Sequence, residues 1–321
     1  MFRYRVYGLT IDSDTRFPEL SWLEKPTDRM ATDVRVRLRT RSATTPSFSK
    51  ILQTTTLPDG TPWLTSGKAD DDYLLRYAEI ADFIVDNAGA DLRCCRVECG
   101  VSTDSLRHLV LDQVLPMLLN RRGREALHAT AIVTSSGACA FSGPAGSGKS
   151  TLAASFFLAG FGALGDDCLP LVEQKGAIGV LPGYPGMRLW NDALEALSTG
   201  AGVTRSVAGY TSKRRALQSQ CAKNFPRKPV TLRRIYRLVR PKDGEPEVSA
   251  PVIESIGPRE AFIELVSSSF ALDLTDSQML RRHFRLMEKV ASTVPVKRLN
   301  VPNDLTTLGA IREAVLTDLG Q

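Results

Sequence analysis

Residues 143–150 combine glycines with a lysine and a serine in an arrangement that could bind phosphate groups. The stretch reads Gly-Pro-Ala-Gly-Ser-Gly-Lys-Ser and fits the pattern G-x-x-x-x-G-K-[ST] without a mismatch. The glycines allow a tight turn whose backbone N–H groups point inward, where they can bind anions. We expect Lys149 to reach the β- and γ-phosphates of a nucleoside triphosphate and the Ser150 hydroxyl to hold Mg²⁺.

The surroundings of this phosphate-binding loop (residues 143–150) favour the same interpretation. Residues 137–142 read as a short buried strand and residues 150–159 as a helix. A helix that begins at the loop adds partial positive charge, which favours a polyphosphate. We therefore predict ATP binding here, rather than a glycine-rich turn with a purely structural role. The residues expected to contact ATP are Gly143, Ala145, Gly146, Ser147, Gly148, Lys149, Ser150 and Thr151.

Two adjacent acids, Asp166 and Asp167, follow the apolar stretch 161–165. A carboxylate at a strand end beside the phosphate-binding loop can hold Mg²⁺, directly or through water. A second carboxylate can accept the proton of an attacking hydroxyl. Neighbouring side chains on an extended strand point to opposite sides, so we expect the two acids to divide these roles. Which acid takes which role stays open, and the alternative for both is a solvated turn residue or a helix cap.

His128 lies in the mostly apolar run 126–133, which reads as a strand paired with the strand that enters the loop. A polar ring in such a strand needs a hydrogen-bond partner. The ring could lie near the γ-phosphate or near an aspartate. His128 is therefore a candidate catalytic residue together with Asp166, Asp167 and Lys149. The alternative is a core histidine whose hydrogen bonds are satisfied by the fold.

The stretch from residue 196 to residue 242 contains no acidic residue. Solvated surfaces normally mix both signs of charge, so this basic segment requires an explanation. We rank contact with phosphates or with an acidic peptide first and a solvated face second. Nucleic acid ranks third, because aromatic residues for base stacking are sparse. The cations of the segment are Arg205, Lys213, Arg214, Arg215, Lys223, Arg227, Lys228, Arg233, Arg234, Arg237, Arg240 and Lys242. Of these, Lys213 and Arg214 are candidate contacts to the nucleotide.

Residues 183–190 contain two glycines and a proline, which predict a tight, irregular loop that presents Arg188 and Trp190. We expect Trp190 to pack partly into the core. Arg188 is a candidate phosphate contact, because a guanidinium can bind phosphate oxygens in pairs.

Composition places the chain among globular proteins, with 43% of its 321 residues hydrophobic and a net charge of +6. The six cysteines follow no zinc-binding spacing. No run of about 18 apolar residues is present to span a membrane. The N-terminus carries arginines within any apolar segment, unlike a secretory signal. We therefore expect a cytoplasmic protein that does not bind membranes.

The order of the elements predicts an α/β (α+β) chain of two domains. Residues 1–102 read as a small β-rich domain, with strands at 2–9, 33–38, 73–77, 81–85 and 92–97. A helix at 103–120 opens the second domain, residues 103–321. There, strands at 126–133 and 137–142 form a hairpin before the loop, which indicates a mixed sheet. Further strands are predicted at 168–172, 177–181, 231–239 and 247–256, and further helices at 192–198, 258–269, 277–292 and 304–318.

The order of a histidine-bearing strand, a phosphate-binding loop and an Asp-Asp pair resembles the kinase domain of the HPr kinase/phosphorylase family. His128 precedes Lys149 by 21 positions and Asp166 follows it by 17, spacings similar to those of the family. The resemblance implies a P-loop kinase domain related to phosphoenolpyruvate carboxykinases, which transfers phosphate from ATP to a serine hydroxyl. It implies Mg²⁺ as a cofactor, with Ser150, Asp166 and Asp167 as its ligands, and it allows a homo-oligomer.

Two features depart from that family. The loop 183–190 stands where the family has its second glycine-rich signature, and residues 1–102 do not resemble the N-terminal domain of the HPr enzymes. The whole chain is more similar to the HPr-kinase-like proteins that accompany lasso-peptide and related gene clusters. Residues 7–12, 127–129 and 183–190 carry this second resemblance. Members of that group phosphorylate a precursor peptide at a serine at or near its C-terminus.

Three functions follow from these patterns. The first is an ATP-dependent serine kinase that acts on a peptide, such as a lasso precursor. The second differs only in the acceptor, which would be an HPr-like carrier protein or a small-molecule hydroxyl. The third is a nucleotide-gated binding module without catalysis, against which the paired acids argue, because a sensor needs no base.

Overall fold

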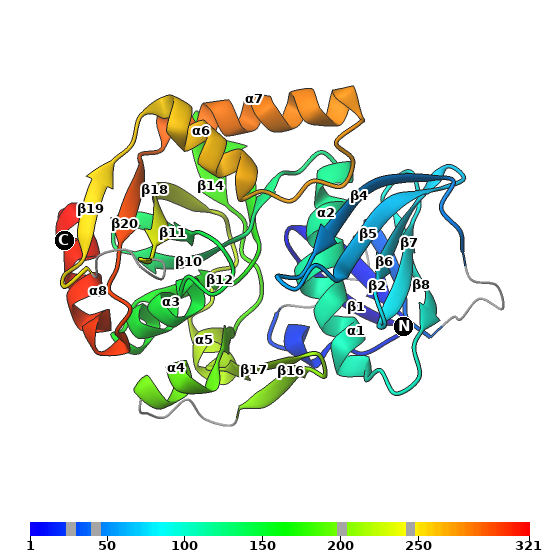
Figure 1. The fold of residues 1–321 in the computed structure, drawn as a ribbon, viewed down its shortest axis with the longest axis horizontal. Coiled ribbons are helices and arrows are strands. Elements are labelled where there is room, and N and C mark those ends of the chain that lie inside the picture. Colours follow the sequence, from blue (N-terminus) through cyan, green and yellow to red (C-terminus); the bar gives the residue numbers. More distant parts are fainter. Residues whose placement is uncertain (24–29, 40–45, 198–203, 242–247) are drawn as a thin grey trace. The chain divides into compact units, whose positions relative to one another are not determined.

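The structure is a computed structural model that describes all residues except 24–29, 40–45, 198–203 and 242–247. Contacts between residues divide the chain into two units (Figure 1). The first unit contains residues 1–124, 208–211 and 270–283, and the second contains residues 125–207, 212–269 and 284–321.

The first unit is built on a sheet whose described strands run in the order β1-β2-β3-β8-β7-β6-β5-β4. The pairs β2–β3 and β3–β8 are parallel and the other pairs are antiparallel. The 3₁₀ turn η1 (Pro18–Leu20) follows β2. The strands are β1 (Phe2–Val6), β2 (Leu9–Ser13), β3 (Val34–Arg37), β4 (Lys50–Thr56), β5 (Pro62–Ala69), β6 (Asp72–Tyr77), β7 (Ala81–Val85) and β8 (Asp91–Val97).

Two details of this sheet differ from the prediction. The single strand expected over residues 2–9 is a hairpin, because Tyr7 and Gly8 turn the chain with φ angles of 55° and 72°. No bounds were predicted for strands β4 and β5, although residues 57–61 between them have the pattern of a turn between strands. Nearly all of β4 is exposed, so its sequence lacks the apolar alternation that marks a half-buried strand.

The helix expected at 103–120 is confirmed, with a change of winding in the middle. It comprises α1 (Thr103–Leu109), the π-helical turn η2 (Val110–Val114) and α2 (Leu115–Arg121). These elements belong to the first unit, so the contact-based division falls after Arg124 rather than after residue 102. The domain boundaries inferred from the sequence remain a prediction.

The second unit contains the mixed sheet that the hairpin predicted. β10 pairs antiparallel with β11, while β18 lies parallel to both β11 and β20. The described strands run in the order β12-β10-β11-β18-β14-β13-β9, with β20 beside β18 and β19 beside β20. They are β9 (Ala126–Leu127), β10 (Ala129–Thr134), β11 (Gly137–Ser142), β12 (Gly162–Gly165), β13 (Leu169–Gln174), β14 (Ala177–Val180), β18 (Val230–Val239), β19 (Val252–Ser255) and β20 (Val296–Asn300).

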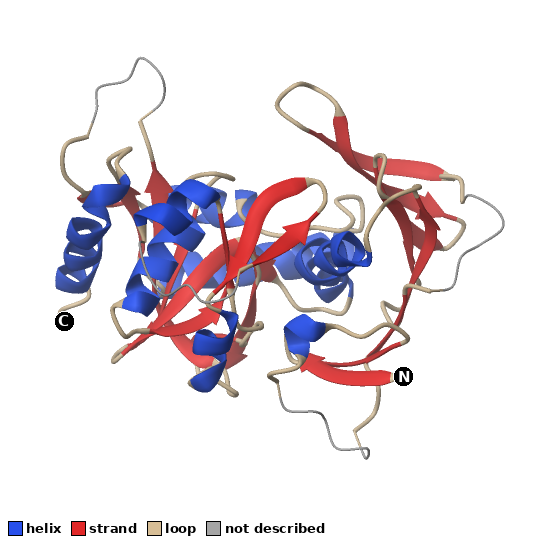
Figure 2. Ribbon diagram, turned by 90° about the horizontal axis from the view of Figure 1, so that it is seen from below, coloured by secondary structure: helices blue, strands red, loops and turns tan. Residues whose placement is uncertain are grey.

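Helices cover this sheet, and their apolar side chains pack against it to form the core of the second unit. Helix α3 (Lys149–Leu158) packs against β10, β11 and β12, and α8 (Leu308–Asp318) lies beside it (Figures 1 and 2). Phe141 stacks between Phe156 and Tyr236, so aromatic packing joins the helix to the sheet. The remaining helices are α4 (Asn191–Ala196), α5 (Gln218–Lys223), α6 (Pro258–Ser267), α7 (Ser277–Thr293) and the 3₁₀ turn η3 (Leu305–Thr307). Residues 277–283 of α7 belong to the first unit.

A second, three-stranded sheet was not predicted. Its strands are β15 (Met187–Leu189), β17 (Thr211–Ala216) and β16 (Arg205–Ala208), paired in that order. It carries Arg188, Lys213 and Arg214. In the described part of the chain, no helix is both long and apolar enough to cross a membrane.

Candidate active site

The phosphate-binding loop connects β11 to α3, as the pattern predicted. Gly143, Gly146 and Gly148 have φ angles of 137°, 81° and 95°, which side chains rarely tolerate. A Cβ atom on Gly143 would also lie 2.9 Å from the carbonyl oxygen of Leu238. The glycines of the motif are therefore required by the turn itself, and the turn delivers the chain to the start of α3.

Lys149 is buried at the start of that helix and is 5% exposed. Its ammonium donates to the carbonyl oxygens of Gly143 and Pro144, at 2.9 and 3.0 Å. Burial lowers the pKa of Lys149, and the nearby Asp167 and Asp166 carboxylates oppose this shift. Lys149 thus sits inside the loop, with two negative charges close enough to sustain its own positive charge.

Asp166 directly follows β12 and is 3% exposed. Its Oδ1 accepts hydrogen bonds from Thr130 Oγ1 at 2.6 Å and from Ser150 Oγ at 2.7 Å. Its Oδ2 accepts from the backbone N–H of Arg188 at 2.9 Å. The second serine of the loop and the first acid are therefore in direct contact, and both oxygens of Asp166 are occupied.

Asp167 is held differently. Its φ angle of 64° takes the chain out of the extended conformation, so the opposite-side argument made for two strand residues does not apply. Its Oδ2 accepts from Arg188 Nε at 3.1 Å, and its side chain is 13% exposed, against 0% for Asp166. Burial alone would raise the pKa of Asp167, but Arg188, with His128, Lys213 and Lys149, holds it well below its usual range. Asp167 is therefore ionised and the more accessible acid.

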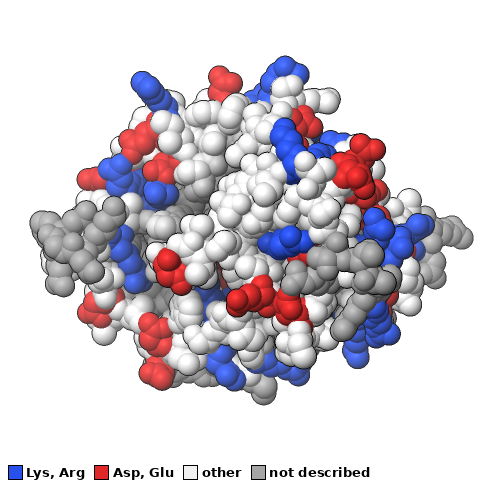
Figure 3. All heavy atoms as spheres, turned by 45° about the vertical axis from the view of Figure 1, so that its right-hand side comes forward, with Lys and Arg blue, Asp and Glu red and all other residues white. Residues whose placement is uncertain are grey.

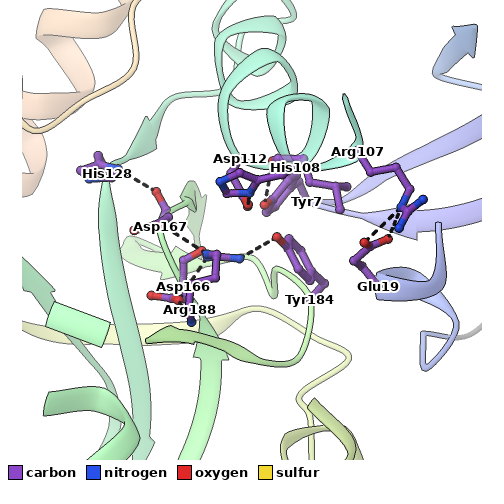
Figure 4. A network of polar contacts seen from close by, with 11 residues as sticks. Tyr7, Glu19, Arg107, His108, Asp112, His128, Asp166, Asp167, Tyr184 and Arg188 are labelled. Carbon is purple, nitrogen blue, oxygen red and sulfur yellow. Dashed lines mark hydrogen bonds and ion pairs between the residues drawn. The ribbon is translucent and has the colours of Figure 1, made fainter. Parts of the chain in front are cut away.

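His128 lies at the break between β9 and β10 and approaches the acid pair (Figure 4). Its Nδ1 is 3.2 Å from the backbone carbonyl oxygen of Asp167, and its backbone N–H donates to Ser268 O at 2.5 Å. Burial lowers the pKa of His128, Lys149 lowers it further, and Asp167 opposes both. The expected neighbourhood of an aspartate is present, although the contact is with its backbone oxygen.

Arg188 contacts both acids from β15 (Figure 4). Its side chain is 1% exposed, its Nη2 lies 3.3 Å from Asp166 Oδ2, and its Nη1 donates to Tyr184 Oη at 2.6 Å. It was predicted as a phosphate contact, and that role remains a prediction. In the structure its guanidinium is paired with both acids.

Two residues that hydrogen-bond to Asp166 or Arg188 were not identified from the sequence. Thr130 was detectable, because it lies two positions after His128 and alternate strand residues share a face. Tyr184 carries no comparable signal, since its contact with Arg188 depends on the fold of the loop 183–190.

Lys213 and Arg214, the other two cations predicted to contact the nucleotide, differ in their surroundings. Lys213 is close enough to influence the charges of Asp167, His128 and Lys149, and its ammonium lies 5.5 Å from the centre of the Trp190 ring. Trp190 is 43% exposed, more than its expected packing suggests. Arg214 instead donates to Thr204 Oγ1 at 2.8 Å.

The cations of the basic segment are divided among several elements of the second unit. In the described part of the chain they lie in β16, β17, α5 and β18 or beside these elements, and two of them meet acids from other parts of the sequence. Arg234 pairs with Asp318, and Arg237 pairs with Glu264 at 2.7 Å. On the face shown in Figure 3, cationic and anionic side chains are interspersed. Lys242 lies outside the described residues.

The site has features that fit a magnesium nucleotide. Ser147 Oγ is buried in the loop, without a hydrogen-bond partner among the described residues. A Cβ on Gly146 would meet nothing within 4 Å, so this side of the loop is open. Within the described residues no cluster of three His, Cys, Asp or Glu could hold a metal alone. A hydroxyl and a carboxylate side by side suit Mg²⁺, which usually takes its other ligands from phosphates and water.

Comparison with known proteins finds a distant structural similarity. No protein-family model matches the chain, and no curated protein does. Among solved structures, the chain is similar to the Hpr(Ser) kinase/phosphatase from Coxiella burnetii. The similarity has 14% sequence identity and a TM-score of 0.34, and it covers 61% of this chain and 99% of that one.

The burial of His128 gives a testable pH dependence. Because its folded-state pKa is lowered from 6.5, the unfolded chain binds more protons below that pH, and the free energy of unfolding falls as pH decreases. One such group contributes a slope of at most about 1.4 kcal/mol per pH unit. Urea unfolding at pH 7.5 and pH 5.5 should show a smaller decrease for His128→Asn than for the unmodified protein. Equal decreases in the free energy of unfolding for the two proteins would show that folding does not lower the pKa of His128.

Proposed function

We propose that this protein is an ATP- and Mg²⁺-dependent kinase that phosphorylates a serine hydroxyl, with a peptide as its acceptor. The observation that carries the proposal is the hydrogen bond of 2.7 Å between Ser150 and Asp166, with a second, more accessible acid beside it. A phosphate-binding loop alone would fit any nucleotide-binding protein. A loop serine joined to an acid pair fits phosphoryl transfer.

The two acids take different roles in this proposal. Both oxygens of Asp166 already accept hydrogen bonds, so Asp166 is not the proton acceptor. Its contact with Ser150 places it beside the hydroxyl that is expected to hold Mg²⁺. Mg²⁺, when bound with the nucleotide, supplies positive charge that neutralises the phosphates. Lys149 and the loop N–H groups bind the β- and γ-phosphates, and Lys213 adds positive charge nearby.

Asp167 is the proposed general base. Its ionised carboxylate accepts the proton of the acceptor hydroxyl as the hydroxyl oxygen bonds to the γ-phosphorus. The bond from that phosphorus to the bridging oxygen breaks, and ADP leaves with the electron pair. His128 and Arg188 position Asp167 through its backbone oxygen and its carboxylate.

The acceptor rests on sequence resemblance alone. A lasso precursor with a serine at or near its C-terminus is the first candidate, and an HPr-like carrier or a small-molecule hydroxyl is the second. A nucleotide-gated binding module without catalysis is the alternative in a different class. A cytoplasmic location and a homo-oligomeric state belong to the same proposal.

Mass spectrometry separates these acceptors. The protein is incubated with Mg²⁺, ATP and, in turn, a serine-ending lasso precursor, its alanine-ending control, and HPr. We expect a gain of one phosphate mass on the serine-ending peptide alone. Transfer to HPr alone would identify a carrier kinase. ATP binding without transfer to any acceptor would contradict the peptide-kinase proposal and favour the binding module.

A further inference from the structure

Arg240 lies directly beside the phosphate-binding loop, although the motif does not include it. It follows β18, which is parallel to β11, with Arg237 opposite Ser142. Both strands therefore end at the same edge of the sheet, where the loop begins. A Cβ atom on Gly148 would lie only 2.6 Å from Arg240 Nη2. The guanidinium thus rests against the glycine that precedes Lys149.

The charge of Arg240 is incompletely matched by its neighbours. Its Nη1 donates to Asn303 Oδ1 at 3.2 Å, which is a neutral partner. Its Nε is buried and has no hydrogen-bond partner in the described part of the protein. Burial lowers the pKa of Arg240, and Asp192 opposes this from beyond ion-pair distance. A partly buried guanidinium in this state gains from an anionic partner.

Other arginines of the same strand show the contrast. Arg234 is paired with Asp318, and Arg237 with Glu264. Among the described residues, no carboxylate lies within 4.0 Å of the Arg240 guanidinium. Arg234 and Arg237 are therefore matched to acids, whereas Arg240, at the loop that is proposed to hold phosphates, has no acid partner among the described residues.

We propose that Arg240 is a second phosphate-binding cation of the nucleotide site, in addition to Lys149. This inference rests on the proposed function and extends it. The planar guanidinium can donate two hydrogen bonds to one phosphate group, which an ammonium cannot do with the same geometry. Asn303 holds Nη1 from one side, while Nη2 lies against the loop at Gly148. Gly148 has no side chain to displace it.

The test compares nucleotides that differ in their number of phosphates. Arg240→Met should weaken ATP binding about 10- to 100-fold, the range for hydrogen bonds to charged groups. The loss should decrease from ATP to ADP to AMP and disappear for adenosine. Arg240→Lys, which keeps the charge, should lose less. Dissociation constants can be measured by calorimetry, and by ligand-observed NMR for the weakest ligands.

Arg233→Met is the matched control. Arg233 is an exposed arginine at the other end of the same strand and donates to Ser136 O, so its loss removes the same charge away from the loop. It should leave all four affinities unchanged. Equal losses for ATP and adenosine in Arg240→Met, or no loss for any, would overturn the phosphate contact while leaving the kinase proposal standing. An unmodified protein that bound no ATP would overturn both.

Discussion

Asp167→Asn is expected to lower kcat about 10²- to 10⁴-fold, the usual contribution of a general base, while ATP binding stays within a few-fold. The amide keeps the size of the carboxylate and can still accept a hydrogen bond from Arg188, so the change mainly removes a proton acceptor. Single-turnover phosphoryl transfer to the acceptor measures kcat, and calorimetry measures ATP affinity. A variant with full activity would contradict the proposed base.

Asp166→Asn separates the two acids, because Asp166 contacts the loop serine. We expect it to raise the Mg²⁺ concentration needed for half-maximal activity, a change that Asp167→Asn should not share. Glu195→Gln in α4 is the control, since it removes an exposed carboxylate from the same unit. If both aspartate variants changed the Mg²⁺ requirement equally, the division of roles would be wrong.

The pH profile of the reaction gives an independent check on the base. Arg188 holds the pKa of Asp167 below its usual value of 3.8, so Asp167 stays ionised from pH 5 to pH 8. Any fall in kcat within that range must come from another group. Protonation of Asp167 would lower kcat only as pH falls below 3.8.

The conformation of the phosphate-binding loop was predictable because its requirements are local. The positive φ angles of Gly143, Gly146 and Gly148 belong to one short turn, so residue types next to each other in the sequence encode them. The strand before the loop and the helix after it have strong periodicities of their own. The hairpin of β10 and β11 is local in the same sense, and the mixed sheet followed from it.

The rest of the site depends on contacts between distant parts of the sequence. Arg188 was assigned to phosphate because nothing in the loop 183–190 shows that β15 brings its guanidinium between two acids. The basic segment appeared unmatched because Asp318 and Glu264 come from helices much later in the chain. Single-sequence patterns contain periodicity and turn chemistry, but they do not specify which charges become partners.

Arg188→Met is expected to lower the free energy of unfolding by about 3–5 kcal/mol, as found when one partner of a buried ion pair is removed. Arg188 is the cation between the fully buried Asp166 and the mostly buried Asp167, and its loss removes the ion-pair partner that they share. Urea unfolding at pH 7 measures the effect. Arg205→Met, an exposed arginine of the same three-stranded sheet, should change stability by less than about 0.5 kcal/mol.

A double-mutant cycle and a pH series show whether this loss is electrostatic. Without Arg188, less positive charge opposes the burial of Asp167, so its folded-state pKa is higher than in the unmodified protein. The folded state then binds more protons, and the destabilisation should shrink as pH falls from 7 towards 4. Adding Asp167→Asn to Arg188→Met should recover part of the lost stability, although each change alone is destabilising. A deficit that was constant with pH and additive in the double variant would mean that Arg188 acts by packing, and the acid pair would then need no cation to stay folded.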